Sequence, residues 1–199
     1  MGNARMIDHR KLAVLAPALL LAGCLSFGSE PPDSLLTLTP SATAPAGTGG
    51  SSASGSAIAL VEFQAPAAID VTRVPVQVSD TEIAYLKEAV WVEKPARLFR
   101  RLIAETIRTR SNRVVVDGDD PGALASNRLT GTLRQFGYDA RTGSVVVVFD
   151  AVRPGEGSAV ETRRFEATVP GVAADVRSVG PALNSAAYDV AGQVADWVS

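Results

Sequence analysis

Apolar and polar positions alternate in several stretches after residue 58, and this alternation predicts a β-sheet. Residues 128–138, 144–153 and 161–169 are typical of three strands, joined by glycine-containing turns at 141–143 and 154–157. The middle stretch is apolar at successive positions, which predicts an interior strand with a neighbour on each side. Shorter strand-like stretches lie at 58–63, 74–78, 82–86, 89–92 and 114–116.

Two further stretches have the spacing of amphipathic helices. The first begins at Pro95, a residue suited to the first turn of a helix. The second begins at Gly180-Pro181 and repeats apolar residues along one face. Those residues are Leu183, Ala187, Val190, Val194 and Trp197. The pattern predicts an α/β fold over 58–199, a two-layer domain in which two amphipathic helices pack on a mixed, largely antiparallel sheet.

The first residues are typical of a targeting sequence. Basic side chains at Arg5, Arg10 and Lys11 precede an uncharged run of twelve residues, 12–23. Twelve helical residues span about 18 Å, short of the roughly 30 Å hydrocarbon core of a bilayer. A cleaved signal peptide is therefore favoured over a transmembrane helix.

The uncharged run ends in Leu21-Ala22-Gly23-Cys24, which resembles the lipobox of bacterial lipoproteins. The resemblance implies a signal peptide over 1–23 and lipids, palmitate among them, on Cys24. Acyl chains at about 0.8 kcal/mol per buried methylene make a stable anchor. Leu25 stands where an aspartate usually retains lipoproteins in the inner membrane, which implies the periplasmic face of the outer membrane. The alternative is a free cysteine buried in an apolar helix.

Residues 24–57 are rich in proline, serine and glycine, which predicts a flexible tether after the lipidated N-terminus. From Cys24 to Ile58 is 34 residues, a reach of roughly 30–35 Å r.m.s. for a flexible chain. One strand-like island, residues 35–40, interrupts the tether and ends at a proline. It either adds a short strand to the main sheet, which we favour, or is an apolar part of the tether.

The composition leaves few side chains for catalysis. The 199 residues contain one histidine, His9, and one cysteine, Cys24. The chain beyond Cys24 therefore lacks the groups for Ser-His-Asp or Cys-His catalysis, for His/Cys metal sites and for an internal disulfide. We predict no enzyme activity and no cofactor. The net charge of −2, from 19 basic and 21 acidic side chains, argues against nucleic-acid binding.

Two charged clusters remain as candidate sites. Asp117, Asp119 and Asp120 lack the residue order of a calcium loop, so a solvated turn is favoured. The basic cluster belongs to the first helix and would suit an acidic partner or phosphate headgroups. Its candidate contact residues are Arg97, Arg100, Arg101 and Arg108, with Arg110 and Arg113 nearby. A solvated helix face is the alternative. Trp91 and Trp197 are expected in the core or at an interface.

Several short motifs occur in an order similar to that of a known family. Residues 35–40 resemble a short Tyr-Tyr-x-Leu-x-Pro strand, and residues 58–70 resemble a first core strand with a Pro-x-x-Leu-Asp-like loop. Glu82-Ile83-Ala84-Tyr85-Leu86, followed by Trp91, resembles an E-I-x-Y…W segment. The helix from Pro95 and the strand 113–116 follow in order. This arrangement resembles the ABC-type transport auxiliary lipoprotein family, which includes paraquat-inducible protein C.

The resemblance implies a non-catalytic accessory component of a Mce-type ABC system that transports lipids between the inner and outer membranes. Its implied partners are a Mce-domain protein and the ABC permease and ATPase of the same system, and a homo-oligomer is compatible with the sequence. The alternative is a lipid-anchored periplasmic protein that binds a small apolar ligand in its own fold. That alternative predicts a cavity between the helices and the sheet.

Overall fold

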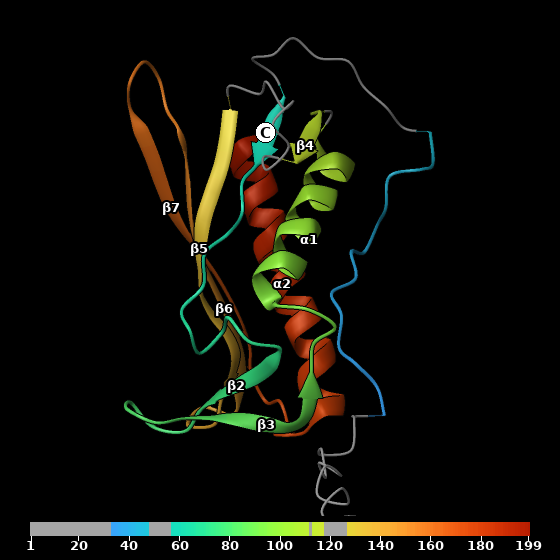
Figure 1. The fold of residues 1–199 in the computed structure, drawn as a ribbon, viewed down its shortest axis with the longest axis vertical. Helices are drawn as coiled ribbons and strands as arrows, with labels where there is room; N and C mark the ends of the chain where they lie inside the picture. Colours follow the sequence, from blue (N-terminus) through green and yellow to red (C-terminus); the bar gives the residue numbers. More distant parts are fainter. Residues whose placement is uncertain (1–32, 48–56, 112, 118–126) are drawn as a thin grey trace, which may run out of the picture. The chain divides into compact units, whose positions relative to one another are not determined.

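A long antiparallel meander, with β7 at one edge, forms the largest part of the sheet, as the alternation predicts (Figure 1). The computed structural model describes residues 33–47, 57–111, 113–117 and 127–199, which belong to one unit, Pro32–Ser199. Strand β6 pairs with β5 on one side and β7 on the other, which confirms its interior position. The three strands are β5 (Asn127–Asp139), β6 (Ser144–Pro154) and β7 (Val160–Val169).

Shorter strands extend the free edge of β5 at two levels. Near the start of β5, β1 pairs with it in parallel, and β4 pairs in parallel with β1. Near its end, β2 pairs with it in parallel, and β3 pairs antiparallel with β2. The sheet of the described residues is therefore mixed, with most of its paired length antiparallel. These strands are β1 (Ile58–Leu60), β2 (Arg73–Gln77), β3 (Ile83–Val90) and β4 (Val115–Asp117).

Two strand predictions need correction. The stretch 58–63 is a strand for only three residues, after which the chain forms an isolated bridge between Gln64 and Thr132. The stretches 82–86 and 89–92 are not separate strands, since β3 runs through both. A bulge at Glu88, whose φ is 61°, lets β3 continue past polar residues that interrupt the alternation.

Both helices cover the same face of the sheet, which confirms the two-layer arrangement (Figure 1). Helix α1 (Pro95–Arg110) begins at the predicted proline. Helix α2 (Val176–Val198) begins four residues before the predicted start at Gly180, so that prediction is wrong. The Asp175 carboxylate accepts hydrogen bonds from the backbone N–H groups of the next turn and starts the helix there. Pro181 lies inside α2, near its start, where it removes one backbone donor.

Aromatic side chains fill the space between the two layers. The ring of Phe149 lies 4.7 Å from that of Phe63 and 5.3 Å from that of Phe99, measured between centroids. Trp91 is buried beside Phe136, and Trp197 packs on Phe165 at 5.6 Å. Both tryptophans therefore contribute to packing, and aromatic rings occupy the space where an internal apolar ligand was considered.

Candidate functional surface on the helix layer

Residues 33–47, which the sequence places in the tether, lie against the folded domain (Figure 1). We call them the N-terminal segment. Leu36 forms a parallel bridge with Trp91 at the end of β3. The Leu36 N–H donates to the Val90 carbonyl at 2.7 Å, and the Val92 N–H donates to the Leu36 carbonyl at 2.9 Å. Residues 35–40 thus reach the sheet through one bridge, not a full strand.

Beyond Leu36, the N-terminal segment contacts both helices. The Thr39 N–H donates to Asn184 Oδ1 of α2 at 2.8 Å. The Ala44 N–H donates to Glu105 Oε1 of α1 at 2.6 Å. Two backbone donors of the segment are therefore satisfied by side chains from different helices, which joins the segment to the helix layer.

The apolar pattern of the segment explains how it packs. Leu36 and Leu38 are half-buried against the core, whereas Leu35 is 51% exposed. Gly180 of α2 provides room for Leu36, because a Cβ at Gly180 would lie 2.8 Å from Leu36 Cδ2. The alternation that resembles a strand in the sequence therefore places leucines against a helix layer.

A third polar contact joins the segment to both helices. Ser41 and Arg110 hydrogen-bond to Tyr188 and lower the pKa of its hydroxyl, Ser41 most strongly. The Arg110 guanidinium lies 5.6 Å from the centroid of the Tyr188 ring and 3.5 Å from Asp196. Arg110 therefore links α1 to α2 beneath the N-terminal segment.

A groove of about 500 Å³ lies between the N-terminal segment and α1. It brings together three of the four predicted contact residues, Arg100, Arg101 and Arg108. The fourth, Arg97, is not among the residues that line it. Thr43 and Glu105 also line the groove, and the other lining residues are apolar: Leu38, Pro40, Leu60, Leu98, Leu102, Ala104 and Val116. The groove can hold an extended apolar group beside hydrogen-bond donors.

Each of the four arginines already has a partner in the domain. Arg97 lies 3.7 Å from Glu62, and Arg101 forms an ion pair with Glu93. Through this hydrogen bond, Arg101 lowers the pKa of Glu93. Arg100 donates to the Leu60 carbonyl at 3.3 Å, and Arg108 contacts Glu105 and the Val115 carbonyl. The cluster is therefore largely neutralised, although Arg97 and Arg101 are 62% and 59% exposed.

A polar cluster that the sequence reasoning missed lies on the sheet. Asp150 on β6 accepts hydrogen bonds from Arg164 at 2.6 and 2.8 Å and from Arg134 at 2.9 Å. These bonds, chiefly those from Arg164, lower the pKa of Asp150 to about 2. Register places Asp150 opposite Arg164, a pairing that strand alternation could have found. Arg134 reaches Asp150 from a bulge between Leu133 and Gln135, and no pattern in the sequence predicts this bulge.

The predicted lipidation site lies outside the described residues. This applies to Leu21, Ala22, Gly23, Cys24 and Leu25, and also to Asp119 and Asp120. Asp117 is the last residue of β4. Across the described ranges, no group of three or more His, Cys, Asp or Glu side chains is placed to hold a metal ion. None of the helices described there is both long and apolar enough to cross a membrane.

The protein is a two-layer α/β domain of a class that also occurs in solved structures. A Xanthomonas campestris protein of the family DUF330 aligns with a TM-score of 0.68 and 16% identity, over 82% of this chain and 93% of that one. A second crystal structure, of an uncharacterized protein, aligns with a TM-score of 0.64 and 12% identity, over 83% and 100%. At these identities, the likeness shows the fold. No curated protein matches the chain significantly.

The sequence identifies the family within that class. Residues 36–195 match the ABC-type transport auxiliary lipoprotein component family, and the chain belongs to it. This confirms the resemblance drawn from the short motifs. The match begins at Leu36, so it includes most of the N-terminal segment as well as the sheet and helices.

Proposed function

We propose that this protein is a periplasmic lipoprotein, held in the outer membrane by lipids on Cys24, that serves a Mce-type ABC system as a non-catalytic accessory component. Such a system transports lipids between the inner and outer membranes. The observation that carries the proposal is the family match over residues 36–195, preceded by the lipobox that ends at Cys24. Leu25 stands in the position of the sorting aspartate, which supports a location in the outer membrane rather than the inner membrane.

The partners we propose are the Mce-domain protein and the ABC permease and ATPase of the same system. We propose the arginine-bearing face of α1 as the contact surface, with Arg97, Arg100, Arg101 and Arg108 as its residues. Two observations support this choice: three of the arginines line one groove, and Arg97 and Arg101 are more than half exposed. Because Arg97, Arg101 and Arg108 are paired with carboxylates, contact would depend on hydrogen bonding and shape more than on net charge.

The alternative of a small apolar ligand inside the fold gains no support from the packing. Phe63, Phe99 and Phe149 contact one another between the helices and the sheet. A ligand of any size there would have to displace these rings, and well-packed cores resist such expansion.

Affinity capture from detergent-solubilised membranes tests the proposed function. We expect the full-length protein to retain a Mce-domain protein and its permease, and Cys24→Ala to retain less of both because it loses the anchor. Mass spectrometry would identify the bound proteins and lipids. Recovery of lipid without any transporter subunit would contradict the proposal and favour the ligand-binding alternative.

The same capture tests the proposed contact surface. The double variant Arg97→Gln and Arg101→Gln removes two exposed charges of α1, and we expect it to lower recovery of the Mce-domain protein several-fold. Arg163→Gln on β7 is the matched control, since Arg163 is also exposed. Equal recovery with both variants would show that the partner binds elsewhere.

A further inference from the structure

The N-terminal segment shortens the connection between the proposed lipid and the domain. With residues 33–47 held against the helices, nine residues lead from Cys24 to Asp33. Nine residues span at most about 32 Å, whatever their conformation. The 34 residues from Cys24 to Ile58 could span more than about 110 Å. An anchored domain with the segment in place is therefore held close to the membrane.

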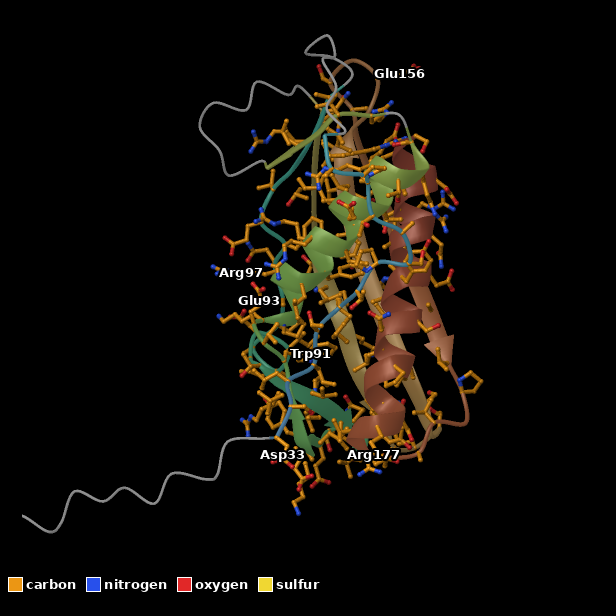
Figure 2. The ribbon with its side chains drawn as sticks, turned by 90° about the vertical axis from the view of Figure 1, so that its right-hand side faces the viewer. Asp33, Trp91, Glu93, Arg97, Glu156 and Arg177 are labelled. Carbon is orange, nitrogen blue, oxygen red and sulfur yellow. The ribbon has the colours of Figure 1, made fainter. Side chains whose placement is uncertain are left out.

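The connection enters at one end of the domain. Figure 2 shows Asp33 and Arg177, near the start of α2, at the same end, and Glu156 of the β6–β7 turn at the opposite end. Helix α2 has 23 residues, a length of about 35 Å. The β2–β3 hairpin also lies at the Asp33 end (Figure 1). This end is therefore the one that the short connection keeps nearest to the lipid.

Four exposed apolar side chains lie in two pairs, one beside each end of β3: Val78 with Ile83 at the hairpin, and Leu35 with Val92 where the N-terminal segment bonds to the chain after β3. Of the five large hydrophobic residues exposed in the described part of the chain, four border β3 or the segment bonded to it. They are Leu35, Val78, Ile83 and Val92, which are 40–51% exposed. The fifth, Val160, follows the turn at the opposite end and is 68% exposed. Four of the five exposed large hydrophobic residues of the described chain therefore follow one strand, and exposed apolar surface of this kind is typical of an interaction site.

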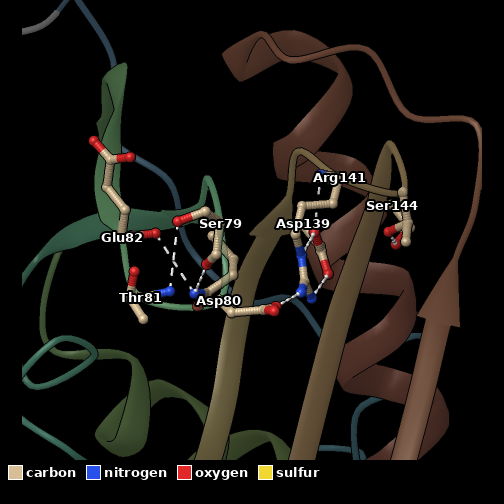
Figure 3. Close-up of polar contacts among 9 residues, drawn as sticks. Ser79, Asp80, Thr81, Glu82, Asp139, Arg141 and Ser144 are labelled. Atoms are coloured by element: carbon tan, nitrogen blue, oxygen red, sulfur yellow. Dashed lines mark hydrogen bonds and ion pairs between the residues drawn. The ribbon is translucent and has the colours of Figure 1, made fainter.

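Polar contacts join the turn of the β2–β3 hairpin to the β5–β6 turn (Figure 3). Arg141, in the β5–β6 turn, forms ion pairs with Asp80 of the hairpin turn and with Asp139 at 2.8 Å. Its hydrogen bond lowers the pKa of Asp139. The hairpin that carries Ile83 is thus fixed to a second turn. Lys87 is likewise paired with Glu88 at 3.4 Å. The hairpin and the adjoining turn carry three basic side chains, Arg73, Lys87 and Arg141, against four acidic ones, Asp80, Glu82, Glu88 and Asp139.

We propose that Leu35, Val78, Ile83 and Val92 form a membrane-facing surface that contacts the lipid bilayer in which the protein is anchored. The N-terminal segment fixes this orientation, and the Glu156 end faces away from the membrane. The contact is apolar, because the hairpin and the adjoining turn carry no excess of basic side chains to bind anionic headgroups. This inference rests on the proposed acylation of Cys24.

Fluorescence quenching in phosphatidylcholine vesicles tests the orientation. The full-length acylated protein would carry Ile83→Cys or, as the matched control, Val160→Cys, each labelled with the same fluorophore. Acylation blocks Cys24, so the label attaches only to the introduced thiol. We expect nitroxide lipids to quench the label at position 83 several-fold more than the label at position 160, and 0.5 M salt to leave the difference unchanged. Equal quenching at both positions would overturn the proposal.

Two further measurements separate the causes. Intact mass establishes whether the protein in the vesicles is acylated. An unacylated protein would refute the proposed anchor. Equal quenching of an acylated protein would refute only the orientation. Leu36→Asp should lower quenching at position 83 toward the level at position 160. Asn184→Ala, which removes the acceptor for Thr39, should do so to a smaller extent. Full quenching in both variants would show that the N-terminal segment does not set the orientation.

Discussion

Replacing Leu36 with alanine tests how the N-terminal segment is held. The side chain of Leu36 is half-buried against the core and lies beside Gly180. Its backbone exchanges hydrogen bonds with Val90 and Val92 at 2.7 and 2.9 Å. The substitution keeps these backbone bonds but removes the side chain that covers them.

The expected magnitude follows from the apolar atoms that are lost. At about 0.8 kcal/mol per buried methylene, three carbons contribute up to about 2.4 kcal/mol when fully buried. Because Leu36 is only half-buried, we expect a loss of about 1–1.4 kcal/mol. That loss corresponds to a roughly five- to tenfold increase in the population of the released segment.

Native-state hydrogen exchange of single amides measures this population. The Val92 amide bonds to the Leu36 carbonyl and should exchange roughly five- to tenfold faster in Leu36→Ala. The neighbouring Trp91 amide bonds to the Thr72 carbonyl at 2.7 Å and should not change. Leu35→Ala is the control variant, because Leu35 is 51% exposed and, unlike Leu36, is not packed against the core. Equal acceleration at Val92 and Trp91, or none at either, would refute the reasoning.

Three further substitutions test the packing and the electrostatics. Asp150→Asn should lower the free energy of unfolding at pH 7 by about 1 kcal/mol, less than the full shift in pKa implies because Arg134 and Arg164 are 53% and 63% exposed. A lowered carboxyl pKa stabilises the fold above the unfolded value of 3.8, so urea unfolding should show the difference from wild type vanishing as the pH falls toward about 2. Gly137→Ala would place a Cβ 2.3 Å from the Pro75 carbonyl oxygen and should cost about 1–3 kcal/mol in the same assay; unchanged stability would show that β2 can move away. Asp175→Ala should lower the midpoint of thermal unfolding followed by circular dichroism, because α2 loses its N-cap; an unchanged midpoint would contradict that role.

The sequence predicts an element well where apolar residues repeat at a regular spacing and a glycine turn or a proline marks its end or start. The meander 128–169 alternates and is divided by glycine turns, and α1 begins at Pro95 as expected. The sequence misplaces the start of α2 because Gly180-Pro181 is a strong local boundary, whereas Asp175 caps the helix. Strand β3 was divided in two because a polar bulge at Glu88 interrupts its alternation.

The candidate surface was less accessible to sequence reasoning because it depends on distant residues. The sequence shows the arginines of α1 as a basic cluster, but the partners Glu62 and Glu93 precede the helix and are seen only in the fold. The N-terminal segment packs through Asn184 and Glu105, polar residues with no local pattern that points to it. Only the tertiary structure shows that part of the predicted tether lies on the helices.

The most direct test of the account captures the Mce-domain protein of the same transport system from outer-membrane fractions and measures the intact mass of this lipoprotein among the bound proteins. The account predicts a chain that begins at Cys24 and carries acyl groups. Capture of an unacylated or uncleaved chain would contradict the proposed anchor. Absence of the chain, while the permease and ATPase are recovered, would contradict its role as an accessory component.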